Sequence, residues 1–163
     1  MQADPEKKRK LRISDPNMAF LKARSYCAYQ ERSQQEVRNK LQEWGLLQDV
    51  IEEILVKLID VDFLNEERFA ITYAGGKFRI KQWGKIKIKH ALKLKGVSDY
   101  CIKKALSAID TENYLTTLSR LIQQKERILK GTNKLAKQRK IAQSILSKGY
   151  ESNLIWEILN RKE

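Results

Sequence analysis

One phrase of apolar residues recurs three times along the 163-residue chain, each time in register with a glycine. The glycines are Gly45, Gly96 and Gly149, spaced about 50 residues apart. Six places around each glycine, from eight residues before it to ten after it, hold an apolar or aromatic side chain. They are Val37, Leu41, Leu46, Ile51, Ile54 and Leu55, then Ile88, Leu92, Val97, Ile102, Ala105 and Leu106, then Ile141, Ile145, Tyr150, Ile155, Ile158 and Leu159. Because only 42% of the chain is hydrophobic, this agreement indicates a tandem repeat.

The spacing inside the phrase predicts two helices joined by a turn. The apolar places before the glycine are one helical turn apart, and those after it follow the spacing of an amphipathic helix. The glycine itself suits the left-handed residue that ends a helix. A further helix is expected before each pair, at about residues 16–30, 65–80 and 111–129. The fold class is therefore all-α, a tandem array of three three-helix repeats with about nine helices, elongated and curved like other stacked repeats.

Local signals place the boundaries of this array. Residues 1–14 are basic and nearly free of apolar side chains, so we expect a disordered basic tail there. The repeats then span residues 15–62, 63–110 and 111–163. Asp15 and Pro16 suit the N-cap and first position of a helix. Ser33 and Glu36 have the spacing of a capping box.

One stretch of the second repeat also has a strand pattern. Lysine and isoleucine alternate strictly from Lys85 to Lys89. However, Ile88, Ala91 and Leu92 continue the run at helical spacing, and helices are expected at the same place in the other repeats. We therefore predict a helix here.

The net charge of +13 is distributed unevenly. Residues 31–62 carry eight acidic and four basic side chains, residues 77–104 carry ten basic and one acidic, and residues 120–140 carry eight basic and one acidic. The first repeat is therefore acidic, whereas the second and third are strongly basic. Such basic segments favour a polyanionic partner, although solvated helix faces are an alternative interpretation.

We predict a surface that binds nucleic acid or a nucleoprotein filament. Its candidate residues are Lys77, Arg79, Lys81, Trp83, Lys85, Lys87, Lys89, Lys93, Lys95, Arg127, Lys130, Lys134, Lys137, Arg139 and Lys140. The aromatic ring of Trp83 can stack on unpaired bases or pack in the core, and both alternatives stay open. Phe78, in the same run, is expected in the core.

The residues offer little for catalysis. The single histidine, His90, has no recognisable catalytic neighbours, and Gly75-Gly76 lacks the continuation of a phosphate loop. The two cysteines, Cys27 and Cys101, are too far apart in sequence and too few for a zinc site. We expect a protein without enzymatic activity or cofactor, with both cysteines as packed thiols. No signal peptide or membrane-spanning run is evident, which favours a cytoplasmic protein.

A central stretch of the chain resembles the RecX family of recombination regulators. Residues 63–70 are similar to the family's signature, with Glu66 where the family usually has aspartate. A glycine, a leucine and a Lys-Gly turn follow as in the family, and the match extends over about residues 18–110. The positions that carry the resemblance, which we expect to be mainly structural, are Leu64, Asn65, Glu66, Arg68, Phe69, Ala70, Gly84, Leu92 and Gly96.

The resemblance implies a function and a partner. Members of this family bind the RecA recombinase filament and inhibit its ATPase, strand-exchange and co-protease activities. They are thought to contact DNA as well, either single-stranded or within the filament, and we expect this chain to act as a monomer. The alternatives are a general DNA- or RNA-binding helical module without a recombinase partner, and a structural adaptor that uses the acidic first repeat.

Overall fold

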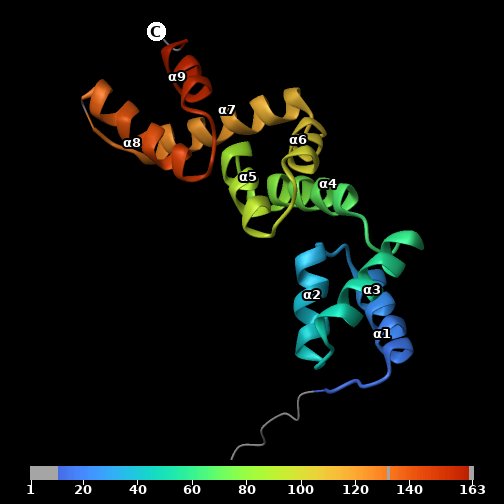
Figure 1. Cartoon of the computed structure of the whole chain (residues 1–163). Helices are drawn as coiled ribbons and strands as arrows, with labels where there is room; N and C mark the ends of the chain where they lie inside the picture. Colours follow the sequence, from blue (N-terminus) through green and yellow to red (C-terminus); the bar gives the residue numbers. More distant parts are fainter. Residues whose placement is uncertain (1–10, 132, 162–163) are drawn as a thin grey trace, which may run out of the picture. The chain divides into compact units, whose positions relative to one another are not determined.

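The computed structural model describes residues 11–131 and 133–161. Within these ranges the chain forms nine α-helices, one π-helical segment and no strand (Figure 1). The α-helices are α1 (Pro16–Tyr29), α2 (Gln34–Glu43), α3 (Gln48–Asp60), α4 (Glu66–Gly76), α5 (Lys85–Leu94), α6 (Asp99–Ser107), α7 (Thr111–Ile128), α8 (Lys134–Ser147) and α9 (Ser152–Asn160). The all-α prediction is confirmed, including a helix across the alternating run from Lys85 to Lys89. The expected elongation and curvature of the array stay a prediction.

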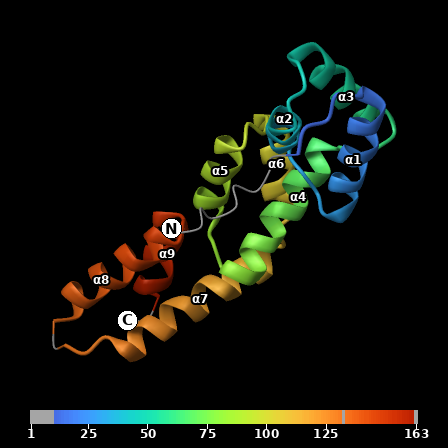
Figure 2. The ribbon, with the colours of Figure 1, turned by 90° about the horizontal axis from the view of Figure 1, so that it is seen from below.

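The helices divide between two compact units, Met1–Glu66 and Glu67–Glu163. The first unit holds α1, α2 and α3, which form the first repeat. The second unit holds α4 to α9, so the second and third repeats share one core. Figure 2 shows α7, α8 and α9 grouped together within this second unit.

The recurring apolar phrase accounts for most of both cores. All but three of its eighteen side chains are buried, and the exceptions, Leu46, Leu106 and Ile158, are half-buried and pack against a core. The three glycines of the phrase all have positive φ, between 75° and 97°. Each therefore adopts the left-handed conformation that ends a helix without a steric cost.

The first repeat caps its own helices. The Asp15 carboxylate accepts a hydrogen bond from the N–H of Asn17 at the start of α1. At α2, the hydroxyl of Ser33 accepts from the N–H of Glu36, and the Glu36 carboxylate accepts from the N–H of Ser33, which completes the predicted capping box. Both helix starts are thus satisfied from within the repeat.

The disordered tail predicted for residues 1–14 extends too far toward the first helix. Residues 1–10 lie outside the described residues, but residues 11–14 are described. Ile13 is buried, and its N–H donates to the carbonyl of Trp44 over 2.9 Å. The first repeat therefore begins before Asp15, because one apolar side chain of the basic segment joins the core.

The leading helix of the second repeat changes type before it ends. The sequence predicts a helix over residues 65–80, but α4 gives way to a π-helical segment, Lys77–Lys81. The segment ends at Gln82, whose φ of 56° is left-handed. The wider turn then leads through Trp83 to Gly84, at the start of α5. Such π-helical turns are rare and often lie at functional sites.

The start of α5 is capped by the third repeat instead of by its own side chains. Its N-cap is Gly84, which has no side chain to accept a hydrogen bond. The N–H of Gly84 donates to the carbonyl of Lys148 over 2.8 Å, and that of Ile86 donates to the carbonyl of Gly149 over 2.9 Å. Between them, the N–H of Lys85 donates to the hydroxyl of Tyr114 over 3.0 Å. Three successive amides of the second repeat are therefore satisfied by groups of the third.

This contact needs glycine on both sides. A Cβ at Gly84 would lie 2.3 Å from the carbonyl carbon and oxygen of Gly149. A Cβ at Gly149 would lie 2.3 Å from the Cβ of Lys87, and the φ of Gly149 is +97°. The role of Gly84, one of the positions behind the family resemblance, is thus to let two backbones approach closely.

Aromatic residues surround the glycine contact. The ring of Tyr114 packs between those of Phe78 and Tyr150, with centroid distances of 5.7 and 5.1 Å. The Tyr114 hydroxyl donates to the Glu151 carboxylate over 2.7 Å, and the Tyr150 hydroxyl donates to the carbonyl of Gln82 over 2.9 Å. Phe78 is buried, as expected from the sequence. Packing and hydrogen bonds therefore join the two repeats at the same place.

Replacing Gly84 by alanine should destabilise the second unit. The added Cβ meets the backbone of Gly149, so the two repeats must move apart, at a cost of about 1–3 kcal/mol. The matched control is Gly76→Ala, because Gly76 is helical and nothing lies within 4 Å of an added Cβ. This control should stabilise the chain by roughly 0.5–1 kcal/mol. Urea unfolding followed by circular dichroism measures both, and equal stability of Gly84→Ala and the unchanged protein would contradict the account.

The stability of the second unit should also fall in alkaline solution. Burial, followed by the charge of Glu151, raises the pKa of Tyr150 from its ordinary value of 10.0 to about 12. Burial likewise raises the pKa of Tyr114. Between pH 10 and about 12 the unfolded chain loses these protons while the folded chain keeps them, so the free energy of unfolding decreases as pH rises. The decrease should be smaller in Tyr150→Phe, and an unchanged pH dependence in that variant would refute the assignment.

Candidate nucleic-acid interface

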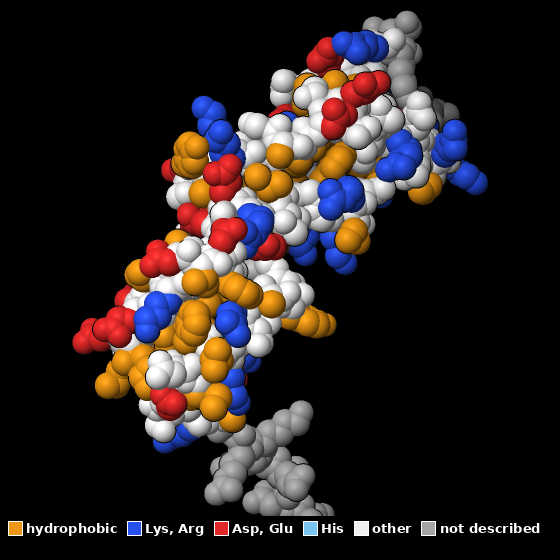
Figure 3. Space-filling model, turned by 90° about the vertical axis from the view of Figure 1, so that its right-hand side faces the viewer, with side chains coloured by type: hydrophobic (Ala, Val, Ile, Leu, Met, Phe, Trp, Pro, Cys, Tyr) orange, Lys and Arg blue, Asp and Glu red, His pale blue; other side chains and the backbone are white. Residues whose placement is uncertain are grey.

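The basic side chains of the second repeat lie on two flanks of α5 instead of on one face. Lys85, Lys89 and Lys93 line a groove toward α6. On the other flank, Lys87 and Lys95 lie near aromatic rings of the α4 side. On the face drawn in Figure 3, lysine and arginine side chains are scattered over the second unit, with apolar side chains between them.

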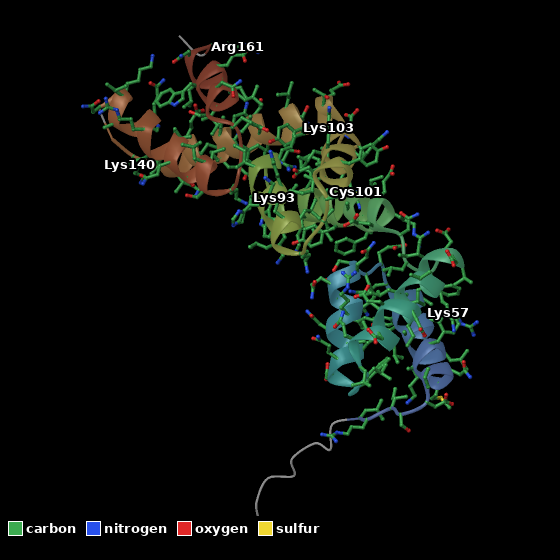
Figure 4. The ribbon with its side chains drawn as sticks, viewed as in Figure 1. Lys57, Lys93, Cys101, Lys103, Lys140 and Arg161 are labelled. Atoms are coloured by element: carbon green, nitrogen blue, oxygen red, sulfur yellow. The ribbon has the colours of Figure 1, made fainter. Side chains whose placement is uncertain are left out.

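We call the first of these sites the lysine groove. It is lined by Lys85, Lys89, Lys93, Asp99, Ile102, Lys103, Leu106 and Ser107, and encloses about 410 Å³. Lys93 and Lys103, on α5 and α6, are labelled in Figure 4. Asp99 is the one acidic residue of the lining, and its carboxylate lies 4.0 Å from the Lys93 ammonium group. The side chain of Asp99 is 89% exposed, so this ion pair is weak.

The second site is a tryptophan cluster, formed by Tyr73, Lys77, Trp83, Lys87 and Lys95. The ammonium groups of Lys77 and Lys87 lie 4.9 and 4.7 Å from the centre of the Trp83 ring. Those of Lys77 and Lys95 lie 5.4 and 5.5 Å from the centre of the Tyr73 ring. Trp83 is half-buried and packs against the core of the second unit. Its ring therefore contributes to packing and also holds two cations in place.

The remaining predicted basic residues lie outside both sites. Arg79 and Lys81 are exposed on the π-helical segment, and the Arg79 guanidinium folds back over Gly75. In the third repeat, Arg127 lies in the last turn of α7, Lys130 follows the helix, and four further residues lie on α8. These four are Lys134, Lys137, Arg139 and Lys140, the last of them labelled in Figure 4. The structure thus divides the predicted surface into separate parts.

Most positions behind the family resemblance are buried or are glycines. Leu64, Phe69, Ala70 and Leu92 are buried, Gly96 has a φ of 75°, and Gly84 makes the backbone contact described above. Asn65 directly precedes α4, and its side-chain amide donates to the Asp62 carboxylate over 3.4 Å. Glu66 is the first residue of α4, and Arg68 is half-buried. Their burial and backbone geometry contribute to the fold, and a mainly structural role for these positions stays a prediction.

One cation of the groove is not among the residues of the predicted binding surface. Lys103 lies on α6 and faces the same groove as the three lysines of α5. Lys103 belongs to the basic segment at residues 77–104, so the sequence already places it in a positively charged region. Only the packing of α6 against α5 shows that it completes the groove.

The structure shows no arrangement typical of catalysis in the described part of the chain. His90 is exposed, and Cys27 and Cys101 are buried thiols. No group of three or more metal-ligating side chains occurs among the residues that the structure describes. Over the same residues, no helix is both long and apolar enough to cross a membrane.

The chain is similar to known proteins over most of its length. Family models described as the first and second three-helix domains of RecX match residues 19–58 and 65–106. Regulatory protein RecX of Clostridium perfringens is 36% identical over 80% of this chain, which spans 61% of that relative. The protein of the same name from Clostridium acetobutylicum is 31% identical over 90% of this chain and 71% of its own length. The Bacillus mycoides protein is 29% identical, and this chain spans about half of it.

Solved structures show the same fold. The crystal structure of RecX from Lactobacillus salivarius is 29% identical and covers 90% of this chain and 95% of its own, with a TM-score of 0.83. A second crystal structure, of a regulatory protein RecX, is 22% identical with a TM-score of 0.80 and supports the fold alone. The two matched three-helix domains coincide with the first two repeats found in the sequence. The chain therefore belongs to the RecX family of regulatory proteins.

Proposed function

We propose that this protein binds the RecA recombinase filament and inhibits its ATPase, strand-exchange and co-protease activities. The observation that carries the proposal is membership of a family of regulatory proteins, with similarity that extends over all three repeats. Because the chain spans only part of several relatives, its partner and activities are proposed here on the family resemblance.

The charge distribution supports a partner that contains DNA. The second and third repeats carry nearly all of the excess positive charge, and most of these lysine and arginine side chains are exposed or half-buried. A recombinase filament on DNA offers phosphates beside protein surfaces. The acidic first repeat can then contact protein while the basic repeats contact the phosphate backbone.

The protein would act by occupying the filament and not by chemistry of its own. Its relatives are named as regulatory proteins, and we propose the same for this chain, as a cytoplasmic monomer without a cofactor. A tandem array of helical repeats suits such a role, because separate repeats can contact different subunits.

The purified protein should slow DNA-dependent ATP hydrolysis by its host's RecA at substoichiometric amounts. Capping or bridging a filament affects many subunits per bound molecule, so less than one molecule per RecA subunit should suffice. A titration of steady-state ATP hydrolysis on preformed filaments measures the effect. Unchanged hydrolysis at saturating protein would contradict the proposal.

A second titration separates this function from simple DNA binding. Free single-stranded DNA is added in excess to preformed filaments before the protein. If the protein contacts RecA as well as DNA, inhibition should persist at concentrations of free DNA that its affinity for DNA alone predicts to be enough to sequester it. Inhibition that disappears in proportion to the added DNA would favour a general nucleic-acid-binding module instead.

A further inference from the structure

We propose that the lysine groove between α5 and α6 binds the sugar-phosphate backbone of a single-stranded nucleic acid. This inference deepens the proposed function, because it assigns the DNA contact to one site among the many basic residues. It rests on the arrangement of four ammonium groups, on the lack of ion pairs and ring contacts at Lys89 and Lys103 within the described residues, and on the floor of the groove.

The lysines of α5 form a regular row. Lys85, Lys89 and Lys93 are each four residues apart, so they follow one another at about 6 Å along the helix axis. Lys103, on α6, lies across the groove from this row. A nucleic-acid strand carries one negative charge per nucleotide, so a row of cations can contact successive phosphates.

Two of these four charges are less neutralised than those of the tryptophan cluster. Within residues 11–131 and 133–161, Lys89 and Lys103 form no ion pair and lie over no aromatic ring. Of the other two groove lysines, Lys85 lies 5.0 Å from the centre of the Tyr114 ring, and Lys93 lies near Asp99, the one acid in the lining. Lys77 and Lys87, by contrast, are held over the Trp83 ring. A polyanion should therefore bind more favourably in the groove than at the tryptophan cluster, because in the groove it displaces only water and one exposed carboxylate.

The floor of the groove is apolar. Ile102 is buried and Leu106 half-buried, both on α6 beneath the lysine side chains. A volume of about 410 Å³ is in the range of sites that hold small molecules, so part of a nucleotide can enter. A single nucleic-acid strand fits this arrangement. Its phosphates can contact the lysines at the rim while a sugar or the face of a base lies on the apolar floor.

An acidic peptide fits this groove less well. Both walls are α-helices, whose backbone N–H and C=O groups are bonded within the helix. An extended peptide would find no main-chain partners there, although such hydrogen bonds supply much of the affinity of peptide grooves. A sugar-phosphate chain has no backbone amides to satisfy. A duplex, whose backbones lie on the outside of a stiff rod, can enter less deeply than a flexible single strand.

The test is the salt dependence of binding to a fluorescein-labelled dT oligonucleotide, measured by anisotropy without recombinase. The double variant Lys89→Gln/Lys103→Gln removes two of the four cations. Each lost phosphate contact should reduce the slope of log K against log salt by about 0.7 for a single strand, hence by about 1.4 in all. The same loss corresponds to roughly 20-fold weaker binding at about 0.1 M salt.

The matched control is Lys22→Gln/Lys57→Gln, which removes the same charge from exposed positions of the first unit. It should leave the slope unchanged. Because all four lysines are exposed, each variant should keep the circular dichroism spectrum and unfolding midpoint of the unchanged protein. The unchanged protein should also bind the dT strand more tightly than a duplex of equal length.

Four results would overturn the proposal. They are an unchanged slope in the groove variant, an equal loss in Lys77→Gln/Lys87→Gln, tighter binding of the duplex, and displacement of dT by poly-glutamate at equal charge concentration. Because RecA is absent, each of these results concerns the groove alone. The ATPase titration tests the proposed function separately, so the two can fail independently.

Discussion

The backbone contact between Gly84 and Gly149 determines the arrangement of the second unit. Two peptide backbones approach so closely that neither position has room for a Cβ. The approach lets the turn before α9 and the hydroxyl of Tyr114 accept the first amides of α5. Since those amides have no acceptor inside their own helix, α5 depends on the third repeat for its N-terminal cap. The position of α5, and with it both lysine sites, follows from this contact.

The repeats therefore differ more in their connections than in their cores. The first repeat satisfies α2 with its own capping box, formed by Ser33 and Glu36, and has a separate apolar cluster. The equivalent position in the second repeat is Gly84. It has no side chain to cap α5, but it lets the backbone pack closely against the third repeat, which supplies the cap. Charge follows the same division, with an acidic first repeat and a joined pair of basic repeats. We propose that the joined pair holds DNA in a fixed geometry while the first repeat contacts protein.

The sequence was sufficient for the core but not for the site. Apolar residues at fixed distances from Gly45, Gly96 and Gly149 report burial directly, because helical periodicity is a local property. The same logic correctly assigned the alternating run at residues 85–89 to a helix. The pattern of charged residues does not show which neighbouring segment each charged side chain faces. Helix geometry alone places Lys87 and Lys89 on opposite flanks of α5, about 200° apart around its axis. Which flank faces α6 and which faces Trp83 depends on how the neighbouring segments pack.

Long-range contacts explain the remaining differences. The partnership of Gly84 with Gly149 joins residues far apart in the chain, and a glycine alone does not indicate its neighbour. The π-helical segment Lys77–Lys81 and the left-handed Gln82 also depend on tertiary structure. The carbonyl of Gln82 accepts a hydrogen bond from the hydroxyl of Tyr150 in the third repeat. Lys103 completes the lysine groove only because α6 folds back on α5. Each of these features needs packing that no local pattern encodes.

The most direct test of this account is the hydrogen exchange of individual amides, followed by nuclear magnetic resonance. The amides of Gly84, Lys85 and Ile86 precede or begin a helix, where exchange is normally fast because the N–H groups lack helical acceptors. If the third repeat caps them, they should exchange as slowly as the core amides of the second unit. The first-turn amides of α9, which has no side-chain cap, serve as the internal reference. Exchange of the three amides as fast as that reference would contradict the joint between the repeats.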